Sequence, residues 1–154
     1  MPESQRIIQI VAESFWPILS AGFAYTIPLT LISFALGLIL AVIVALVRIA
    51  NVRVFSKIAA FYVWIVRGTP LLVQIFIIFY GLPNAGIVLD PVAAGIIAFS
   101  LNVGAYSSET VRASILSIPK GQWEAAYSLG MTYYQALRRV VLPQAAKVSV
   151  PPLF

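Results

Sequence analysis

Long apolar runs separated by short polar segments form the main pattern along this chain. Residues 15–47 carry no charged side chain, and a membrane-spanning helix needs only about 20 apolar residues. We therefore predict a first transmembrane helix within residues 21–47. The pattern predicts two more spans, one over residues 55–80 and one over residues 92–113.

The first sixteen residues have a different pattern. Ile7, Val11 and Phe15 recur at four-residue steps, and charged residues lie between them. This spacing predicts an amphipathic helix at the membrane surface with Trp16 at headgroup depth, followed by one membrane domain over residues 17–154. A cleavable signal peptide is the weaker alternative, because the amino-terminal region is not net basic.

The second span contains two unusual residues. Pro70 is expected to kink one long, tilted helix. Arg67 is expected either to reach toward the basic side of the membrane or to be buried in a protein interface.

Small residues recur in the first span, where Gly37, Ala41 and Ala45 follow one another at four-residue steps. Such a stripe allows another helix to approach closely. Lipid-facing small residues would give the same pattern, so both interpretations stay open.

Composition supports a polytopic, all-α membrane protein. Of the 154 residues, 61% are hydrophobic and only 10% are charged, whereas about a quarter of a soluble domain is charged. The chain has no cysteine and no histidine, which excludes catalysis or metal binding by those side chains. We predict no catalytic residue, no metal site and no cofactor. Because no P-loop motif occurs, any ATP would be used by a partner subunit.

Basic residues are distributed unevenly along the chain. Lys and Arg number one in residues 1–14, four in residues 48–67, none in residues 80–111 and five in residues 112–147. Because short cytoplasmic loops are enriched in Lys and Arg, we predict a multi-pass protein of the plasma membrane with its amino terminus outside.

A polar segment at about residues 114–146 interrupts the apolar pattern. Its composition predicts a helix over residues 122–129 that Gly130 ends in a left-handed conformation. Thr132 is placed to cap a second helix over residues 133–141, and Pro143 is expected to end it. The result would be a helix-turn-helix at the membrane surface.

Two motifs resemble a known family. Glu124-Ala125-Ala126, then Gly130, then Leu142-Pro143 have the spacing of the EAA loop in the membrane subunits of bacterial ABC importers. The segment Arg67-Gly68-Thr69-Pro70-Leu71-Leu72-Val73-Gln74, continuing to Tyr80-Gly81-Leu82-Pro83, is similar to the polar amino acid and opine branch. The stretch from Tyr80-Gly81-Leu82-Pro83 through Leu89-Asp90-Pro91 is similar to permeases for cystine and related amino acids.

This resemblance implies the transmembrane domain of a type I ABC importer, with three transmembrane helices and the coupling-helix loop present. It implies three protein partners: an ABC ATPase, an extracytoplasmic solute-binding protein, and a second permease subunit, identical or different. Since the family continues with more helices after this loop, the chain is expected to lack its later carboxyl-terminal helices. The residues expected to contact the ATPase are Gln122, Trp123, Glu124, Ala125, Ala126, Tyr127 and Gly130.

The polar face of the third span is the candidate translocation path. Asn102, Tyr106 and Glu109 lie at i, i+4 and i+7, so they share one side of a helix. Gln74 is a fourth candidate. An alternative for Glu109 is an ion pair with Arg112, three residues away on the same helix.

Two other classes of function stay open at this point. One is an ATP-independent channel or secondary transporter for small polar solutes. The other is a membrane-embedded enzyme or scaffold, although an enzyme would need catalytic groups clustered at one depth. Copurification with a soluble ATPase would distinguish the importer from both classes.

Overall fold

The computed structural model describes residues 3–153, and all the regular elements in that range are helical. The prediction of an all-α fold is confirmed. Two helical stretches of the described chain are long and apolar enough to cross a membrane, Gln5–Ala50 and Pro91–Leu116. A third stretch qualifies if the bent pair Arg53–Arg67 and Leu71–Ala85 is counted as one span.

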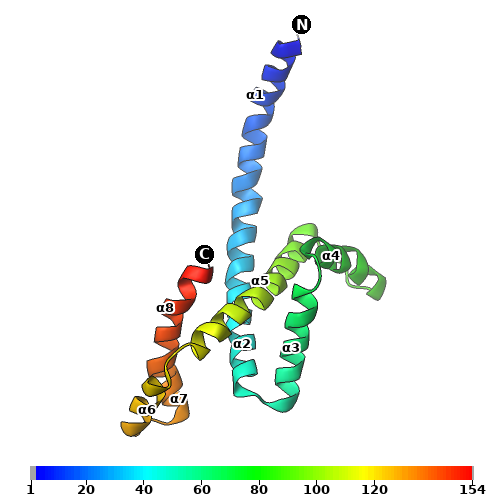
Figure 1. Ribbon diagram of the computed structural model, residues 1–154. Helices are drawn as coiled ribbons and strands as arrows, with labels where there is room; N and C mark the ends of the chain where they lie inside the picture. Colours follow the sequence, from blue (N-terminus) through cyan, green and yellow to red (C-terminus); the bar gives the residue numbers. More distant parts are fainter. Residues whose placement is uncertain (1–2, 154) are drawn as a thin grey trace.

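The amino-terminal half of the first stretch continues directly into the first transmembrane helix. α1 (Glu3–Ala21), a π-helical turn η1 (Gly22–Thr26) and α2 (Ile27–Ala50) form one long rod (Figure 1). Asn51 ends this rod with a left-handed φ of 51°. The predicted amphipathic segment therefore has no break at Trp16 that would separate it from the helix that follows, and its first two residues lie outside the described range.

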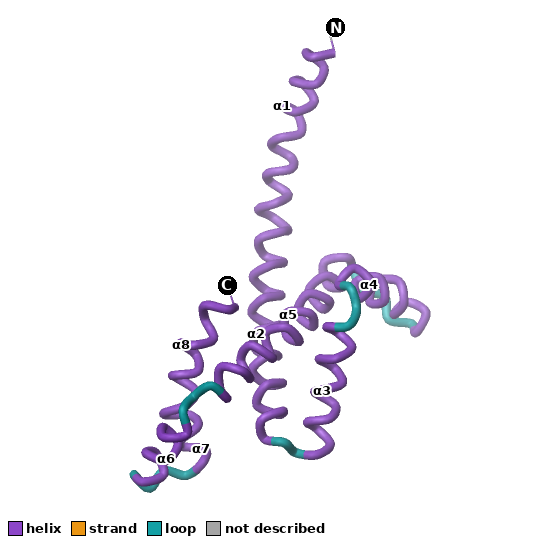
Figure 2. The backbone as a smooth tube through the Cα atoms, in the orientation of Figure 1, coloured by secondary structure: helices purple, strands orange, loops and turns teal. Residues whose placement is uncertain are grey.

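The second predicted span is broken rather than kinked. α3 (Arg53–Arg67) and the helical arm Leu71–Ala85, which begins with α4 (Leu71–Phe76), meet at an angle of 108°, and a turn separates them (Figure 2). Pro70 at the break has an extended ψ of 139°, so α4 starts in a new direction. The prediction of one kinked helix over residues 55–80 is wrong. The arm continues from α4 through η2 (Ile77–Gly81) and η3 (Leu82–Ala85).

The third predicted span is present as α5 (Pro91–Leu116). Asp90 caps its first turn, because the carboxylate accepts hydrogen bonds of 3.0 Å from the backbone N–H groups of Val92 and Ala93. Pro91 fits this first position, where its missing N–H leaves no helical bond unmade.

α2 and α5 cross in close contact, and small residues make this possible. Gly37, Ala41 and Ala45 of α2 are all buried. A Cβ atom on Gly37 would lie 2.7 Å from Cβ of Val103, and one on Gly104 would lie 2.8 Å from Leu40. The small-residue stripe is therefore a helix–helix interface, and the lipid-facing alternative is wrong for these residues.

The predicted helix-turn-helix is present as α6 (Lys120–Ser128) and α7 (Tyr133–Ala136). Gly130 has a φ of 76°, its N–H donates to Tyr127, and the N–H of Met131 donates to Ala126. These are the two hydrogen bonds of a Schellman motif. Thr132 caps α7 in a capping box with Gln135. The predicted cap at Thr132 is therefore confirmed.

Pro143 does not end the second helix of this motif, contrary to the prediction. After α7, a π-helical turn η4 (Leu137–Val141) leads directly into α8 (Leu142–Leu153). In η4 the N–H of Leu142 donates to the carbonyl of Leu137, five residues back. This wider turn accommodates the carbonyl that the proline leaves without a backbone donor, so the helix passes through Pro143.

A buried cluster joins the helix-turn-helix to the ends of the two spanning helices. Ala45 of α2 and Ile115 of α5 pack with Val141 of η4, and Trp123 of α6 packs against them. α6 and α7 thus pack at the lower end of the α2–α5 pair in Figure 1.

The α2–α5 interface leads to a first prediction. Gly37→Ala should destabilise the folded protein in detergent by about 1–3 kcal/mol, because the added methyl group overlaps the rigid Cβ of Val103. Thermal unfolding followed by circular dichroism would measure the loss. The control is Gly22→Ala, where an added Cβ has nothing within 4 Å. Equal stability of the two variants would contradict the close packing described here.

Candidate translocation path and coupling surface

A polar cavity of about 430 Å³ lies between α3, α5 and the end of α2. Two of the predicted path residues, Tyr106 and Glu109, line it, whereas Gln74 and Asn102 do not. The cavity is lined by Arg48, Ala60, Val63, Trp64, Arg67, Gly68, Tyr106 and Glu109.

Glu109 forms an ion pair with Arg48 of α2 across this cavity. Nη1 of Arg48 donates to Oε1 of Glu109, and the two side chains are 17% and 29% exposed. Arg112 makes no ion pair with any residue that the structure describes. The alternative that paired Glu109 with Arg112 is therefore wrong, because the crossing of α2 over α5 brings a second arginine to the carboxylate.

Arg67 lies on the other side of the same cavity, where it is exposed and not buried in a protein interface. Its guanidinium carbon is 5.2 Å from the ring centroid of Tyr106, within the range of a cation–π contact. Arg67 is the last residue of α3, so the helix break sets its position. Within residues 3–153 it has no carboxylate partner.

Gln74 and Asn102 are joined to each other beside the helix break. Nδ2 of Asn102 donates to Oε1 of Gln74 at 3.3 Å, and Nε2 of Gln74 donates to the carbonyl of Val66 at 2.7 Å. The four predicted path residues therefore form two groups: Tyr106 and Glu109 at the cavity, and Gln74 and Asn102 at the break.

The predicted coupling residues divide into exposed and inward-facing sets. Ala126 is buried, and Trp123 is half-buried because it stacks on Tyr133 with ring centroids 5.5 Å apart. Trp123 therefore supports α6 from within, with part of its side chain still exposed. The exposed members are Gln122, Glu124, Ala125, Tyr127 and Gly130.

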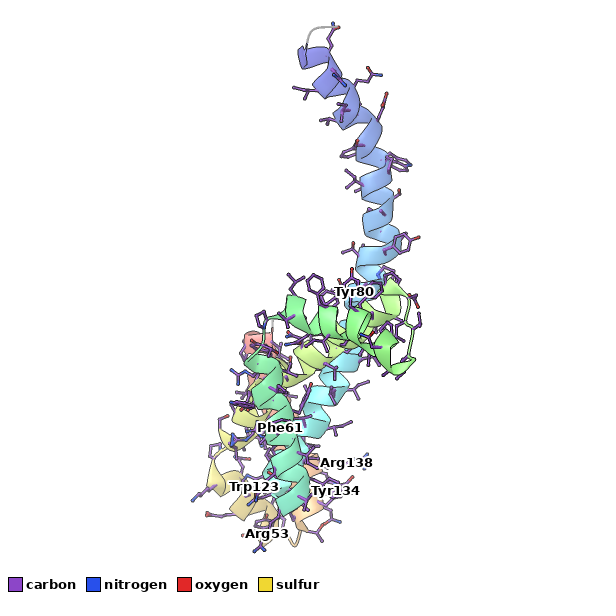
Figure 3. The ribbon with its side chains drawn as sticks, turned by 90° about the vertical axis from the view of Figure 1, so that its right-hand side faces the viewer. Arg53, Phe61, Tyr80, Trp123, Tyr134 and Arg138 are labelled. Carbon is purple, nitrogen blue, oxygen red and sulfur yellow. The ribbon has the colours of Figure 1, made fainter. Side chains whose placement is uncertain are left out.

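Other exposed residues lie close to this surface. In Figure 3 the labelled side chains of Tyr134 and Arg138 lie at the same end of the molecule as Trp123 and Arg53, whereas Tyr80 lies near the middle. Tyr134 is 67% exposed.

Sequence reasoning did not identify Arg48 or Trp64 as cavity residues. Arg48 is 61 positions from its partner Glu109, so no local spacing indicates their contact. The only local indication was that Arg48 is an arginine in the last turn of a long apolar helix. An arginine at that place is equally typical of a membrane boundary.

Residues 33–154 match the family described as "Binding-protein-dependent transport system inner membrane component". The chain belongs to this family. The resemblance to the membrane subunits of bacterial ABC importers, predicted from the Glu-Ala-Ala motif and its spacing to Gly130, is confirmed.

Several relatives are amino-acid permeases. The chain is 60% identical over 144 residues to the L-cystine transport system permease protein TcyB of Bacillus subtilis, covering 94% of this chain and 62% of TcyB. It is 41% identical over 138 residues to the arginine transport system permease protein ArtQ of the same organism, covering 89% of this chain and 63% of ArtQ. The chain thus spans less than two thirds of the length of these relatives.

A solved structure has the same fold. The crystal structure of an amino acid ABC transporter with histidines aligns with a TM-score of 0.83 and 35% identity, over 94% of this chain and 67% of that chain. The predicted placement in the amino-acid branch is confirmed by these matches.

The ion pair leads to a second prediction. Glu109→Gln should destabilise the assembled subunit by about 1–3 kcal/mol, because it leaves the partly buried guanidinium of Arg48 without its partner. The double variant Arg48→Gln/Glu109→Gln should cost less than the sum of the single variants, since neither charge is then left alone. Chemical unfolding in detergent measures the coupling.

The matched control for this cycle is Arg112→Gln on the same helix. It should unfold like the wild type, because Arg112 has no ion-pair partner in the described chain. Coupling of Glu109 to Arg112 instead of Arg48 would refute the assignment.

Proposed function

We propose that the chain is the membrane-spanning permease part of an ATP-driven amino-acid importer. The observation that carries this proposal is the exposed surface of α6. The turn at Gly130 orients this surface outward, and a shared core connects α6 to α2 and α5. Membership of the transport family supports it. The chain contributes no covalent chemistry, and ATP is hydrolysed by a separate subunit.

The exposed residues of α6 are proposed to contact that ATPase subunit. Glu124 and Tyr127 both face away from the core, and Tyr127 is 45% exposed. Aromatic side chains at an exposed helix face contribute strongly to protein interfaces. Trp123 holds the face in place from behind, through its stack on Tyr133.

Movement at this surface would pass directly to the spanning helices. Val111 and Ile115 of α5 pack in the same cluster as Val141, and Trp123 packs against that cluster. When two ATPase subunits close, the state in which α6 contacts them best is favoured. The spanning helices then change which side of the membrane the solute path faces.

The polar face of α5 and its cavity are proposed to belong to that path. The cavity contains two guanidinium groups and one carboxylate, and the carboxylate is already paired with Arg48. The guanidinium of Arg67 can therefore receive the carboxylate of an amino acid. The name of the relative TcyB supports L-cystine as the first solute to test.

The partners follow from the same proposal. They are an ABC ATPase on the cytoplasmic side, a solute-binding protein outside, and a second permease subunit, identical or different. The amino terminus is proposed to lie outside in the bacterial plasma membrane, so that the basic segment after α5 faces the ATPase.

A third prediction tests the coupling surface in the full-length subunit. Gly130→Val should abolish uptake or assembly with the ATPase, because its φ of 76° costs an L-residue about 1–2 kcal/mol and distorts the turn. Glu124→Lys should weaken assembly by reversing an exposed charge. Copurification of the ATPase and uptake of labelled L-cystine into proteoliposomes are the measurements.

The control for Gly130→Val is Gly22→Val, at a helical glycine with open space around it. It should assemble and transport normally. If both coupling variants also behave like the wild type, the role of α6 is wrong. Uptake that needs no ATPase would favour an ATP-independent channel instead.

A fourth prediction concerns orientation. Residues 1–154 contain no cysteine, so in a full-length subunit with any other cysteine replaced, single cysteines at Asn84 and Gln122, both exposed, can be labelled without background. A membrane-impermeant maleimide should label Asn84→Cys in intact cells and Gln122→Cys only after the cells are opened. Labelling of Gln122→Cys from outside would reverse the assigned topology.

A further inference from the structure

The break between α3 and α4 leaves backbone carbonyls at the end of α3 without their helical donors, among them those of Ile65 and Val66. In a continuous helix, the N–H at position 70 would donate to the carbonyl of Val66, but Pro70 has no N–H. The N–H of Thr69 would likewise serve Ile65. Unpaired carbonyls are costly in an apolar environment, so other donors are needed here.

Two side chains supply these donors. Nε2 of Gln74 donates to the carbonyl of Val66 at 2.7 Å and to the carbonyl of Thr69 at 3.0 Å. It also lies 3.0 Å from Oγ1 of Thr69, and that hydroxyl donates to the carbonyl of Ile65 at 2.9 Å. The side chain of Gln74, which belongs to α4, therefore supplies hydrogen bonds to the backbone carbonyls at the break.

The other end of the same amide connects the break to α5. Oε1 of Gln74 accepts the 3.3 Å hydrogen bond from Asn102. Both ends of the Gln74 amide are thus engaged by the chain itself. Three elements, α3, α4 and α5, meet at this one side chain.

We propose that Gln74 is a positioning residue that holds the 108° break and sets the place of Arg67 above Tyr106. Arg67 directly follows Val66, whose carbonyl Gln74 holds, and Tyr106 lies one turn after Asn102 on α5. This inference deepens the proposed function, on which its transport consequence rests. It also means that Gln74, a candidate path residue from its sequence position, acts through Arg67 and makes no contact with the solute.

Spin-label distances test the geometric part of the inference without solute. Cysteines at Val54 of α3 and Ile77 of η2, 64% and 61% exposed, report the angle of the break. Residues 1–154 have no native cysteine, and any cysteine elsewhere in the complex is replaced first. The full-length subunit assembled with its ATPase in nanodiscs should show one narrow distance distribution. Gln74→Leu should broaden it and lengthen its mean, because the carbonyls of Val66 and Thr69 then lack a donor.

Three further variants make the test specific. Gln74→Glu keeps the size of the side chain but removes the donor, so it should broaden the distribution as Leu does and serves if the Leu variant assembles poorly. Asn102→Leu should leave the α3–α4 distance unchanged, because it removes only the bond to α5. Asn84→Leu, an amide in the same arm whose bond to Tyr80 is exposed, should match the wild type.

Uptake provides the second readout. Gln74→Leu and Gln74→Glu should lower the initial uptake rate about tenfold, the size expected for losing one internal hydrogen-bond donor, while Asn84→Leu should not. Lower uptake with an unchanged distance distribution would overturn the proposal in favour of direct solute contact. An unchanged distribution with normal uptake would overturn it as well. If the wild type shows no uptake, the proposed function fails, and the distance distributions still decide whether Gln74 holds the break.

Discussion

The close crossing of α2 and α5 is the contact on which the rest of the structure depends. Apolar helices gain little by leaving lipid for each other, so their association relies on packing that small residues permit. Gly37 and Gly104 leave no room for a Cβ at the crossing. This short separation brings Arg48 to Glu109, and it places the ends of both helices where they form one core with η4.

A second constraint is the backbone at Pro28, Pro70, Pro83 and Pro143, and the chain meets it in two ways at these four positions. Pro28, Pro83 and Pro143 each follow the last residue of a π-helical turn by two positions, and the chain stays helical through them. Wider turns of this kind accommodate carbonyls that a proline leaves free. At Pro70 side chains provide the donors instead, and the chain changes direction by 108°. At these four prolines, the helix continues where a π-helical turn precedes the proline and breaks where side chains donate to the freed carbonyl.

Local features of the fold could be predicted from sequence, and contacts between helices could not. Gly130 and Thr132 determine the turn between α6 and α7 through their own backbone preferences, so spacing was enough to find it. The partner of Glu109 depends on how two helices cross, and a local rule selected Arg112 wrongly. A proline normally ends a helix, and no spacing in the sequence indicates the π-helical turn that lets the helix continue through Pro143.

The shared core also determines how a push on α6 would act. Ile115 in the core is six residues from Glu109, about 9 Å along a rigid helix. Ala45 of α2 lies in that core too, three residues before Arg48. α3 is fixed to α2 through Val44, Ala59 and Val63. A displacement of α6 would therefore move both partners of the ion pair together, as one body, and rotation of the unit would require less free energy than separation of Arg48 from Glu109.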